Sequence, residues 1–231
     1  MKKNIALTSG IIFFILFFIF TALILTVDVQ PIGPNNSTVG LATINSAVAD
    51  ALEYNEIWYN VSEYVGYIPL AIAAAFAFLG LFQAIQRKSL FKIDRYLFVI
   101  AGFYVAVLSA YIIFEIFEIN YRPVLIDGKL EASFPSSHTM LAICILSTAI
   151  FEFHTLLKNR KAYLIFTDIF CIIVGAVILI GRLLSGVHWL SDIIAGILLS
   201  VALVCFFIFA SLLLKERSDR KIKNKENTVN D

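Results

Sequence analysis

The sequence predicts an all-α membrane protein, a bundle of six transmembrane helices. Hydrophobic residues make up 60% of the 231 residues and charged residues only 15%, and the mean hydropathy is +0.87. Six apolar runs each approach the roughly 20 residues that a helix needs to cross a bilayer. Such a composition excludes an ordinary soluble domain. The net charge of +1 gives no reason to expect a nucleic-acid partner.

The first apolar run, residues 5–27, follows Lys2 and Lys3 and is predicted to stay in the membrane as a span. It is too long for a typical signal peptide and no A-x-A cleavage site follows it. Residues 28–64 then form a turn-rich extracytoplasmic loop. Its second half, 47–64, fits either an amphipathic interfacial helix or an ordered loop. The charged residues of this loop are all acidic: Asp28, Asp50, Glu53, Glu56 and Glu63.

Five further runs complete the predicted membrane domain, which spans residues 1–214: they are 65–85, 96–119, 139–157, 163–180 and 189–214. The charged tail 215–231 has almost nothing to bury, so we expect it to be disordered. Cys144, Cys171 and Cys205 lie inside apolar runs without C-x-x-C spacing and are interpreted as core residues. His154 and Glu152 near the end of the fourth span are interpreted as structural.

The distribution of basic residues orients the chain, because short cytoplasmic loops carry an excess of Lys and Arg. If both termini are cytoplasmic, every Lys and Arg lies on the cytoplasmic side except Arg122, Lys129 and Arg182. Basic residues on the opposite side need a local explanation. We expect an integral protein of a bacterial cell membrane, with its active site at the extracytoplasmic face.

The polar stretch 181–192 lies between the last two spans and carries Arg182, His188 and Asp192, in a chain with only three histidines. If His188 begins a helix, Asp192 lies four residues on, on the same face. Its carboxylate would accept a hydrogen bond from one imidazole nitrogen and leave the other nitrogen free as a nucleophile.

A second polar stretch, between the third and fourth spans, carries Arg122, Ser136, Ser137 and His138 and meets the same membrane surface. Guanidinium groups and the start of a helix both bind phosphate, and histidine transfers protons at neutral pH. Each residue alone also fits a structural role, as an interfacial anchor or a helix cap. Together they indicate phosphoryl chemistry without a metal or another cofactor.

Three motifs resemble the signatures of the type 2 phosphatidic acid phosphatase superfamily, whose relatives include vanadium haloperoxidases. They are R-P at Arg122, P-S-S-H at 135–138, and R-x5-H-x3-D from Arg182 to Asp192. The resemblance implies that His188 is the nucleophile, Asp192 its orienting carboxylate and His138 the general acid. It also implies a set of phosphate ligands: Arg122, Arg182, Ser136 and, through its backbone, Ser137.

One position departs from the family pattern, since Glu115 stands where the first motif begins with lysine. An ionised carboxylate repels a phosphate dianion. Glu115 would then pair with Arg122 or Arg182, recognise a positive group on a lipid, or mark a diverged binder; Lys129 is a candidate for the missing cation. Gly181 similarly replaces a family serine.

The resemblance therefore implies a membrane phosphohydrolase that acts on a lipid phosphate or diphosphate through a phosphohistidine. Phosphatidic acid, phosphatidylglycerophosphate and polyprenyl diphosphate are the expected substrate classes. Two alternatives stay open: a phospholipid binder without ordinary phosphatase activity, and an enzyme that transfers the phosphoryl group to another acceptor. A transporter is less favoured, because the polar residues gather at one face. The exact lipid and the oligomeric state are open.

Overall fold

The computed structural model is all-helical and describes the backbone of residues 1–230 and the side chains of residues 1–220. Within this part, six helices are long and apolar enough to cross a membrane, which confirms the predicted fold class. They are α1 (Lys2–Thr26), α3 (Glu56–Gln86), α4 (Arg95–Ile116), α5 (Ser137–Leu156), α6 (Lys161–Leu184) and α7 (Leu190–Asn230). The shorter elements are α2 (Ala42–Leu52), η1 (Pro34–Asn36) and η2 (Leu90–Lys92).

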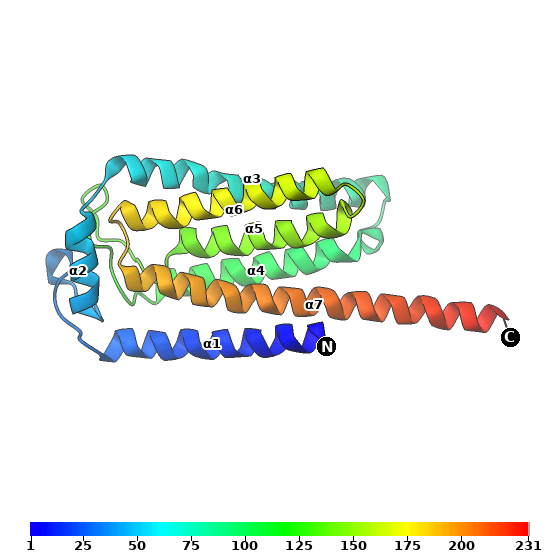
Figure 1. The fold of residues 1–231 in the computed structure, drawn as a ribbon, viewed down its shortest axis with the longest axis horizontal. Helices are drawn as coiled ribbons and strands as arrows, with labels where there is room; N and C mark the ends of the chain where they lie inside the picture. Colours follow the sequence, from blue (N-terminus) through cyan, green and yellow to red (C-terminus); the bar gives the residue numbers. More distant parts are fainter. Residues whose placement is uncertain (231) are drawn as a thin grey trace.

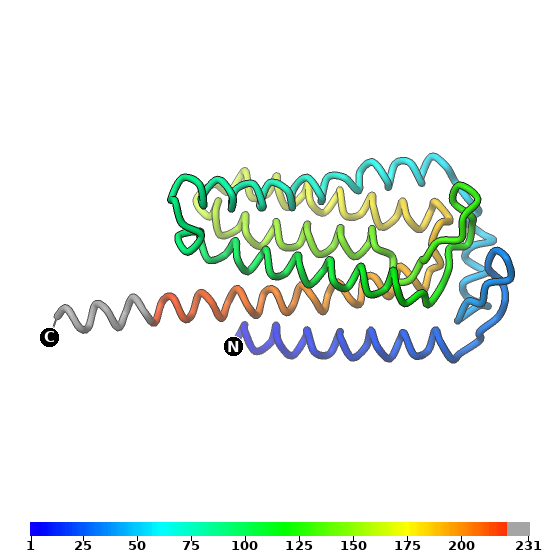
Figure 2. The backbone as a smooth tube through the Cα atoms, turned by 180° about the vertical axis from the view of Figure 1, so that it is seen from behind, coloured from blue at the N-terminus to red at the C-terminus, as the bar shows by residue number. Residues whose placement is uncertain are grey.

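Helix α5 lies at the centre of the bundle (Figure 1). Half of its most apolar window is buried, against 22% or less in each of the other spans. Helix α1 runs beside α7, and Figures 1 and 2 place both chain ends away from α2. The end of the bundle that carries α2 is called the α2 end below, and the other is called the terminal end. Because α5 begins and α6 finishes at the α2 end, the polar stretches between them meet there.

The loop predicted at 28–64 contains two helices, which corrects both the loop and the start of the second span. Helix α3 begins at Glu56 because the side chain of Asn55 caps it, accepting a hydrogen bond from the backbone N–H of Trp58 at 3.1 Å. Neither interpretation of 47–64 is right, because α2 and α3 are separate helices that meet at Glu53, where φ is 29°.

The junction of α2 and α3 packs on the turn between α6 and α7. Asn45 is buried in α2 and exchanges hydrogen bonds with Ser191, from Nδ2 to Oγ at 2.9 Å and from the Ser191 N–H to Oδ1 at 3.1 Å. Gly186 has a φ of +66°, and a Cβ there would meet the Glu53 carbonyl oxygen at 2.6 Å. Only glycine fits this position, which holds the segment before α7 in place.

At the terminal end, charged groups pair with each other near the surface. Arg87 donates to Asp94 at 2.7 Å across the α3–α4 turn, and His154 lies 2.8 Å from Asp168 between α5 and α6. His154 is therefore a surface ion-pair partner, consistent with the structural role predicted for it. Cys144 and Cys171 are buried, Cys205 is partly buried, and all three thiols are free.

Helix α7 continues beyond residue 214, where the sequence predicts the start of a disordered tail. Glu216 pairs with Lys3 of α1 and with Arg220 one turn on, so residues up to Arg220 stay helical. The side chains after Arg220 lie outside the described residues.

Candidate active site

All the residues predicted for the site lie at the α2 end of the bundle. Arg122 lies in the α4–α5 loop, Arg182 in the last turn of α6, and His188 in the α6–α7 turn. The backbone N–H of Ser136, just before α5, donates to the Asp192 carbonyl at 3.0 Å and joins the second and third motifs directly. Folding therefore brings together the segments that the motifs implied.

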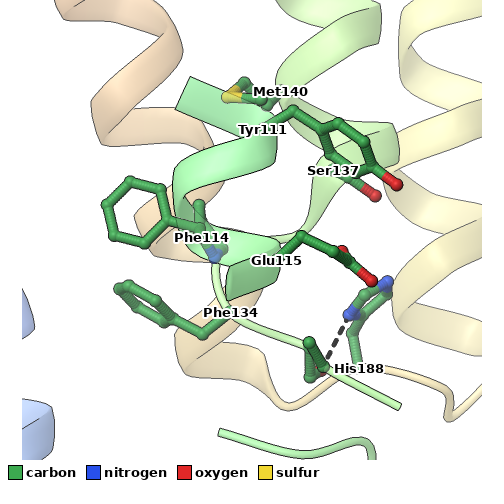
Figure 3. A pocket seen from close by; sticks show the side chains of 10 residues that line it. Tyr111, Phe114, Glu115, Phe134, Ser137, Met140 and His188 are labelled. Atoms are coloured by element: carbon green, nitrogen blue, oxygen red, sulfur yellow. Dashed lines mark hydrogen bonds between the residues drawn. The ribbon is translucent and has the colours of Figure 1, made fainter. Parts of the chain in front are cut away.

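His188 is held by a serine and not by Asp192 directly, which corrects the predicted His–Asp hydrogen bond. Its Nδ1 lies 3.0 Å from Oγ of Ser133, and the same hydroxyl donates to Oδ2 of Asp192 at 2.5 Å (Figure 3). The helical spacing fails because α7 begins at Leu190, so His188 precedes the helix. Asp192 instead caps that helix start by accepting from the Trp189 N–H at 3.2 Å.

The Ser133 bridge determines which nitrogen of His188 is free. A carboxylate can only accept, so the single hydroxyl proton of Ser133 goes to Asp192, and the hydroxyl oxygen then accepts from Nδ1–H of His188. The lone pair is left on Nε2, which is buried and has no partner among the described side chains. Burial, reinforced by the positive charges of Arg122 and Arg182, lowers the pKa of His188 well below its usual value. The imidazole is neutral at neutral pH.

Asp192 is fully buried and accepts a further hydrogen bond from Nδ2 of Asn120 at 3.0 Å. Asn120 and Ser133 are themselves buried, and neither was selected from the sequence. Both lie in the polar stretch around the first two motifs, where no local pattern separates them from ordinary loop residues. Only their burial against Asp192 reveals that they belong to the site.

Arg182 is fully buried at the end of α6, and only one of its nitrogens has a hydrogen bond. Nη2 donates to Oε2 of Glu63 at 2.6 Å, while Nε and Nη1 have no partner among the described side chains. The guanidinium also lies over the Tyr59 ring, 5.5 Å from its centroid. Arg182 therefore keeps two buried donors free for a ligand.

Gly181, next to Arg182, has a packing role that the sequence did not predict. A Cβ at this position would come within 2.9 Å of Cβ of Ser62 on α3. The absence of a side chain allows α6 and α3 to approach closely, and this approach brings Glu63 within reach of Arg182.

Glu63 also reaches His138. Its Oε2 lies 3.3 Å from Nε2 of His138, so one carboxylate oxygen bridges the imidazole and Arg182. The sequence placed Glu63 only among the acids of the loop 28–64, whereas the structure has it in the second turn of α3. Nδ1 of His138 is buried without a partner.

Arg122 pairs with a nearby acid in its own loop. Its Nε lies 3.2 Å from Oε2 of Glu131, without the geometry of a hydrogen bond, and its backbone N–H donates to the Glu131 carbonyl at 3.0 Å. Arg122 and Arg182 both act on His188 electrostatically, which shows that the two arginines lie near the same imidazole.

Ser136 precedes α5 at the capping position, but its hydroxyl does not cap the helix. The side chain is fully buried, makes no capping hydrogen bond, and has no partner among the described side chains. Ser137 is the first residue of α5 and keeps its backbone N–H at the helix start. A helix N-terminus with a free hydroxyl beside it is a typical anion-binding arrangement.

Glu115 lies in the last turn of α4 and lines a small cavity with Tyr111, Ser137 and His188 (Figure 3). The cavity holds about 20 Å³, enough for roughly one water. Glu115 makes no ion pair with any described residue; Arg122 and Arg182 pair with other acids, so the predicted pairing with an arginine is wrong. Lys129 lies in an exposed turn closed by paired bonds between Ile126 and Lys129.

A second cavity of about 170 Å³ shares Tyr111 and Ser137 with the first. Its polar wall carries Glu63 and His138. Its apolar wall, from α3, α5 and α6, includes Pro69, Leu70, Leu141, Ala142 and Ile178. The arrangement places a greasy slot directly beside the polar groups.

Comparisons with known proteins point to one family. The model of the PAP2 superfamily matches residues 117–215. The bacitracin transport permease protein BcrC of Bacillus licheniformis is 31% identical over 129 residues, which cover 48% of this chain and 58% of that protein. The chain thus matches less than two thirds of that relative's length.

Among solved structures, the crystal structure of a transmembrane PAP2-type phosphatidylglycerolphosphate phosphatase from Bacillus subtilis has the same fold. The TM-score is 0.59 at 18% identity, and the match covers 90% of this chain and 96% of that chain. Together these matches confirm the predicted resemblance, and the chain belongs to the PAP2 superfamily through residues 117–215, the segment that holds the motif residues from Arg122 to Asp192.

Proposed function

We propose that the protein is a membrane phosphohydrolase that removes phosphate from a lipid phosphate or diphosphate through a phosphohistidine on His188. One observation carries this proposal: free donors of Arg182 and Ser136 and the free Nε2 of His188 are buried at the same end of the bundle. Buried polar groups without partners are costly, and a phosphate would supply what these donors lack.

In the first step, Nε2 of His188 attacks the phosphorus, and the bond from phosphorus to the lipid oxygen breaks. His138 gives its proton to that oxygen, so the lipid leaves as an alcohol or a shorter phosphate. Arg122, Arg182 and Ser136 stabilise the charge on the remaining phosphate oxygens. Ser133 accepts the Nδ1 proton and Asp192 stabilises the positive charge that develops on the imidazole.

In the second step, a water attacks the phosphorus and the bond to Nε2 breaks. The now neutral His138 takes a proton from that water, which returns both histidines to their starting states. Inorganic phosphate leaves. Every step uses this chain's own residues, and we predict that activity persists when divalent cations are chelated.

The expected substrate is a lipid because the 170 Å³ cavity presents an apolar wall beside His138. An acyl or prenyl chain fits such a slot while the phosphate binds at its polar end. Phosphatidic acid, phosphatidylglycerophosphate and polyprenyl diphosphate are the substrate classes to compare. We assign the site to the extracytoplasmic side, with both termini cytoplasmic, because the positive charges of the short loops lie at the terminal end.

The test is phosphate release from a panel of these three lipids by purified protein, with the His188→Ala variant as control. We expect release above the level of the variant for at least one lipid. Equal release from both proteins would instead support a phospholipid binder, the alternative that Glu115 raises. Adding sugar or lipid acceptors to a trapped phosphoenzyme separates transfer from hydrolysis, since hydrolysis needs no acceptor but water.

A further inference from the structure

Glu63 stands where a phosphate oxygen is expected. One oxygen, Oε2, lies 2.6 Å from Nη2 of Arg182 and 3.3 Å from Nε2 of His138. In the proposed function these two groups hold and protonate the substrate phosphate. A phosphate oxygen bound between them would need the place that the carboxylate already has. The motifs contain no hint of this acid, because α3 lies outside the segment that matches the family.

Glu63 is not held by anything else. Its hydrogen bond and ion pairs, among the described residues, all go to Arg182 and His138. The side chain is 31% exposed and lines the 170 Å³ cavity, so it has space to leave. Arg182, in contrast, is fully buried on a packed helix and cannot move with it.

We propose that Glu63 is a specificity-determining residue: its tethered carboxylate occupies the anion subsite and yields to a dianionic terminal phosphate but not to a monoanionic phosphodiester. This inference rests on the proposed function, because it concerns how that substrate is selected. It names the accepted class as phosphate monoesters and terminal diphosphates.

The physical reason lies in what surrounds a membrane enzyme. Ordinary phospholipids are phosphodiesters with a single negative charge on the phosphate, and the bilayer holds them at high local concentration. An open pair of cationic donors would bind them and block the site. A carboxylate on the same chain competes at an effective concentration of about the millimolar range or above. It carries the same charge as a diester, so the diester gains little by replacing it.

A terminal phosphate has the advantage of a second charge. Its additional oxygens reach the free donors of Arg182 and Ser136, which the Glu63 carboxylate leaves without a partner. Charge-assisted hydrogen bonds of this kind are about twice as strong as neutral ones. The dianion therefore repays the displacement of Glu63, whereas the monoanion does not.

The experiment compares two soluble probes, methyl phosphate and dimethyl phosphate, by phosphorus NMR titration at about pH 8, where a phosphate monoester with a second pKa of about 6 is a dianion. The protein is the full chain carrying His188→Ala, so that no turnover occurs. Against this background, Glu63→Gln should tighten dimethyl phosphate binding by about tenfold, because the tethered competitor is gone. The preference for methyl phosphate should shrink accordingly.

Glu56→Gln is the matched control, since it removes the same charge from the exposed first turn of α3 and should leave both affinities unchanged. Glu63→Ala is a second neutral variant and must shift the preference in the same direction. Weaker binding of both probes by the Glu63 variants would overturn the proposal and make Glu63 a positioning residue. Unchanged affinities, or no binding of methyl phosphate by any protein, would overturn it as well.

These outcomes are separate from those of the proposed function. If the intact chain releases no phosphate but the binding preference still depends on Glu63, hydrolysis is wrong and the selection mechanism stands. If phosphate is released and the preference ignores Glu63, the reverse holds.

Discussion

The two ends of the bundle treat polar groups in opposite ways. At the terminal end, Arg87 and Asp94, and likewise His154 and Asp168, satisfy each other close to the surface. At the α2 end, Arg182 and Ser136 are fully buried and keep donors without partners. Exposed pairs contribute little and call for no ligand. Buried donors without partners are costly, and proteins tolerate that cost mainly at functional sites.

The largest effect should come from the nucleophile. His188→Ala removes the only nitrogen that the structure leaves free for attack, and we expect the rate constant kcat to fall by about 10³-fold or more. The measurement is phosphate release from the best lipid of the panel, with retained melting temperature as the check on folding. Near-normal kcat in a folded variant would show that the chemistry lies elsewhere.

Ser133 tests the bridge between His188 and Asp192. Ser133→Ala breaks the path that holds Nδ1–H, and we expect a loss of about tenfold to a hundredfold in kcat, the range found when the hydrogen-bond partners of functional histidines are removed. Ser133→Thr keeps the hydroxyl and should restore most of the rate. If alanine and threonine behaved alike, the hydroxyl would have no part in orienting His188.

The pH dependence tests the neutral state of His188. Burial lowers its pKa, so the neutral and nucleophilic form persists as the pH falls below the value at which an exposed histidine would be protonated. The acid limb of the kcat/KM profile should therefore lie below pH about 6.5, the usual histidine value. Below the folded pKa, the rate should drop about tenfold for each pH unit. An acid limb above the usual value would contradict the buried, neutral imidazole.

Glu115 tests how charge is balanced at the α2 end. Glu115→Lys places a cation beside His188 where the structure has an unpaired carboxylate, and we expect KM for an anionic lipid to fall by about tenfold, a gain of about 1.4 kcal/mol at an effective dielectric between protein and water. Glu118→Lys makes the same change three residues on, at a side chain that bonds Tyr121 instead of lining the cavity. A weaker enzyme after Glu115→Lys would show that the carboxylate has its own role in the site.

The smallest effect should come from the terminal end. Asp168→Asn removes the surface partner of His154, and we expect the free energy of unfolding to change by no more than about 0.5 kcal/mol. Activity should stay at the level of the parent protein. A clear loss of phosphate release would mean that the two ends are coupled, and the contrast between them would fail.

The sequence by itself determined the membrane fold and the motif residues. A span depends on one property, a run of about 20 apolar residues whose backbone must satisfy its own hydrogen bonds, and this can be counted along the chain. Span ends were less certain: α3 begins at Glu56 because Asn55 caps it, a local signal inside a segment interpreted as loop.

Only the tertiary structure decided which groups touch. Ser133 stands between His188 and Asp192 because His188 precedes α7, so that helical spacing does not govern the pair. Glu63 reaches Arg182 because Gly181 lets α3 and α6 approach closely. Such contacts depend on how far helices rotate and slide against each other, and that packing is set by the whole core and not by any local run of residues.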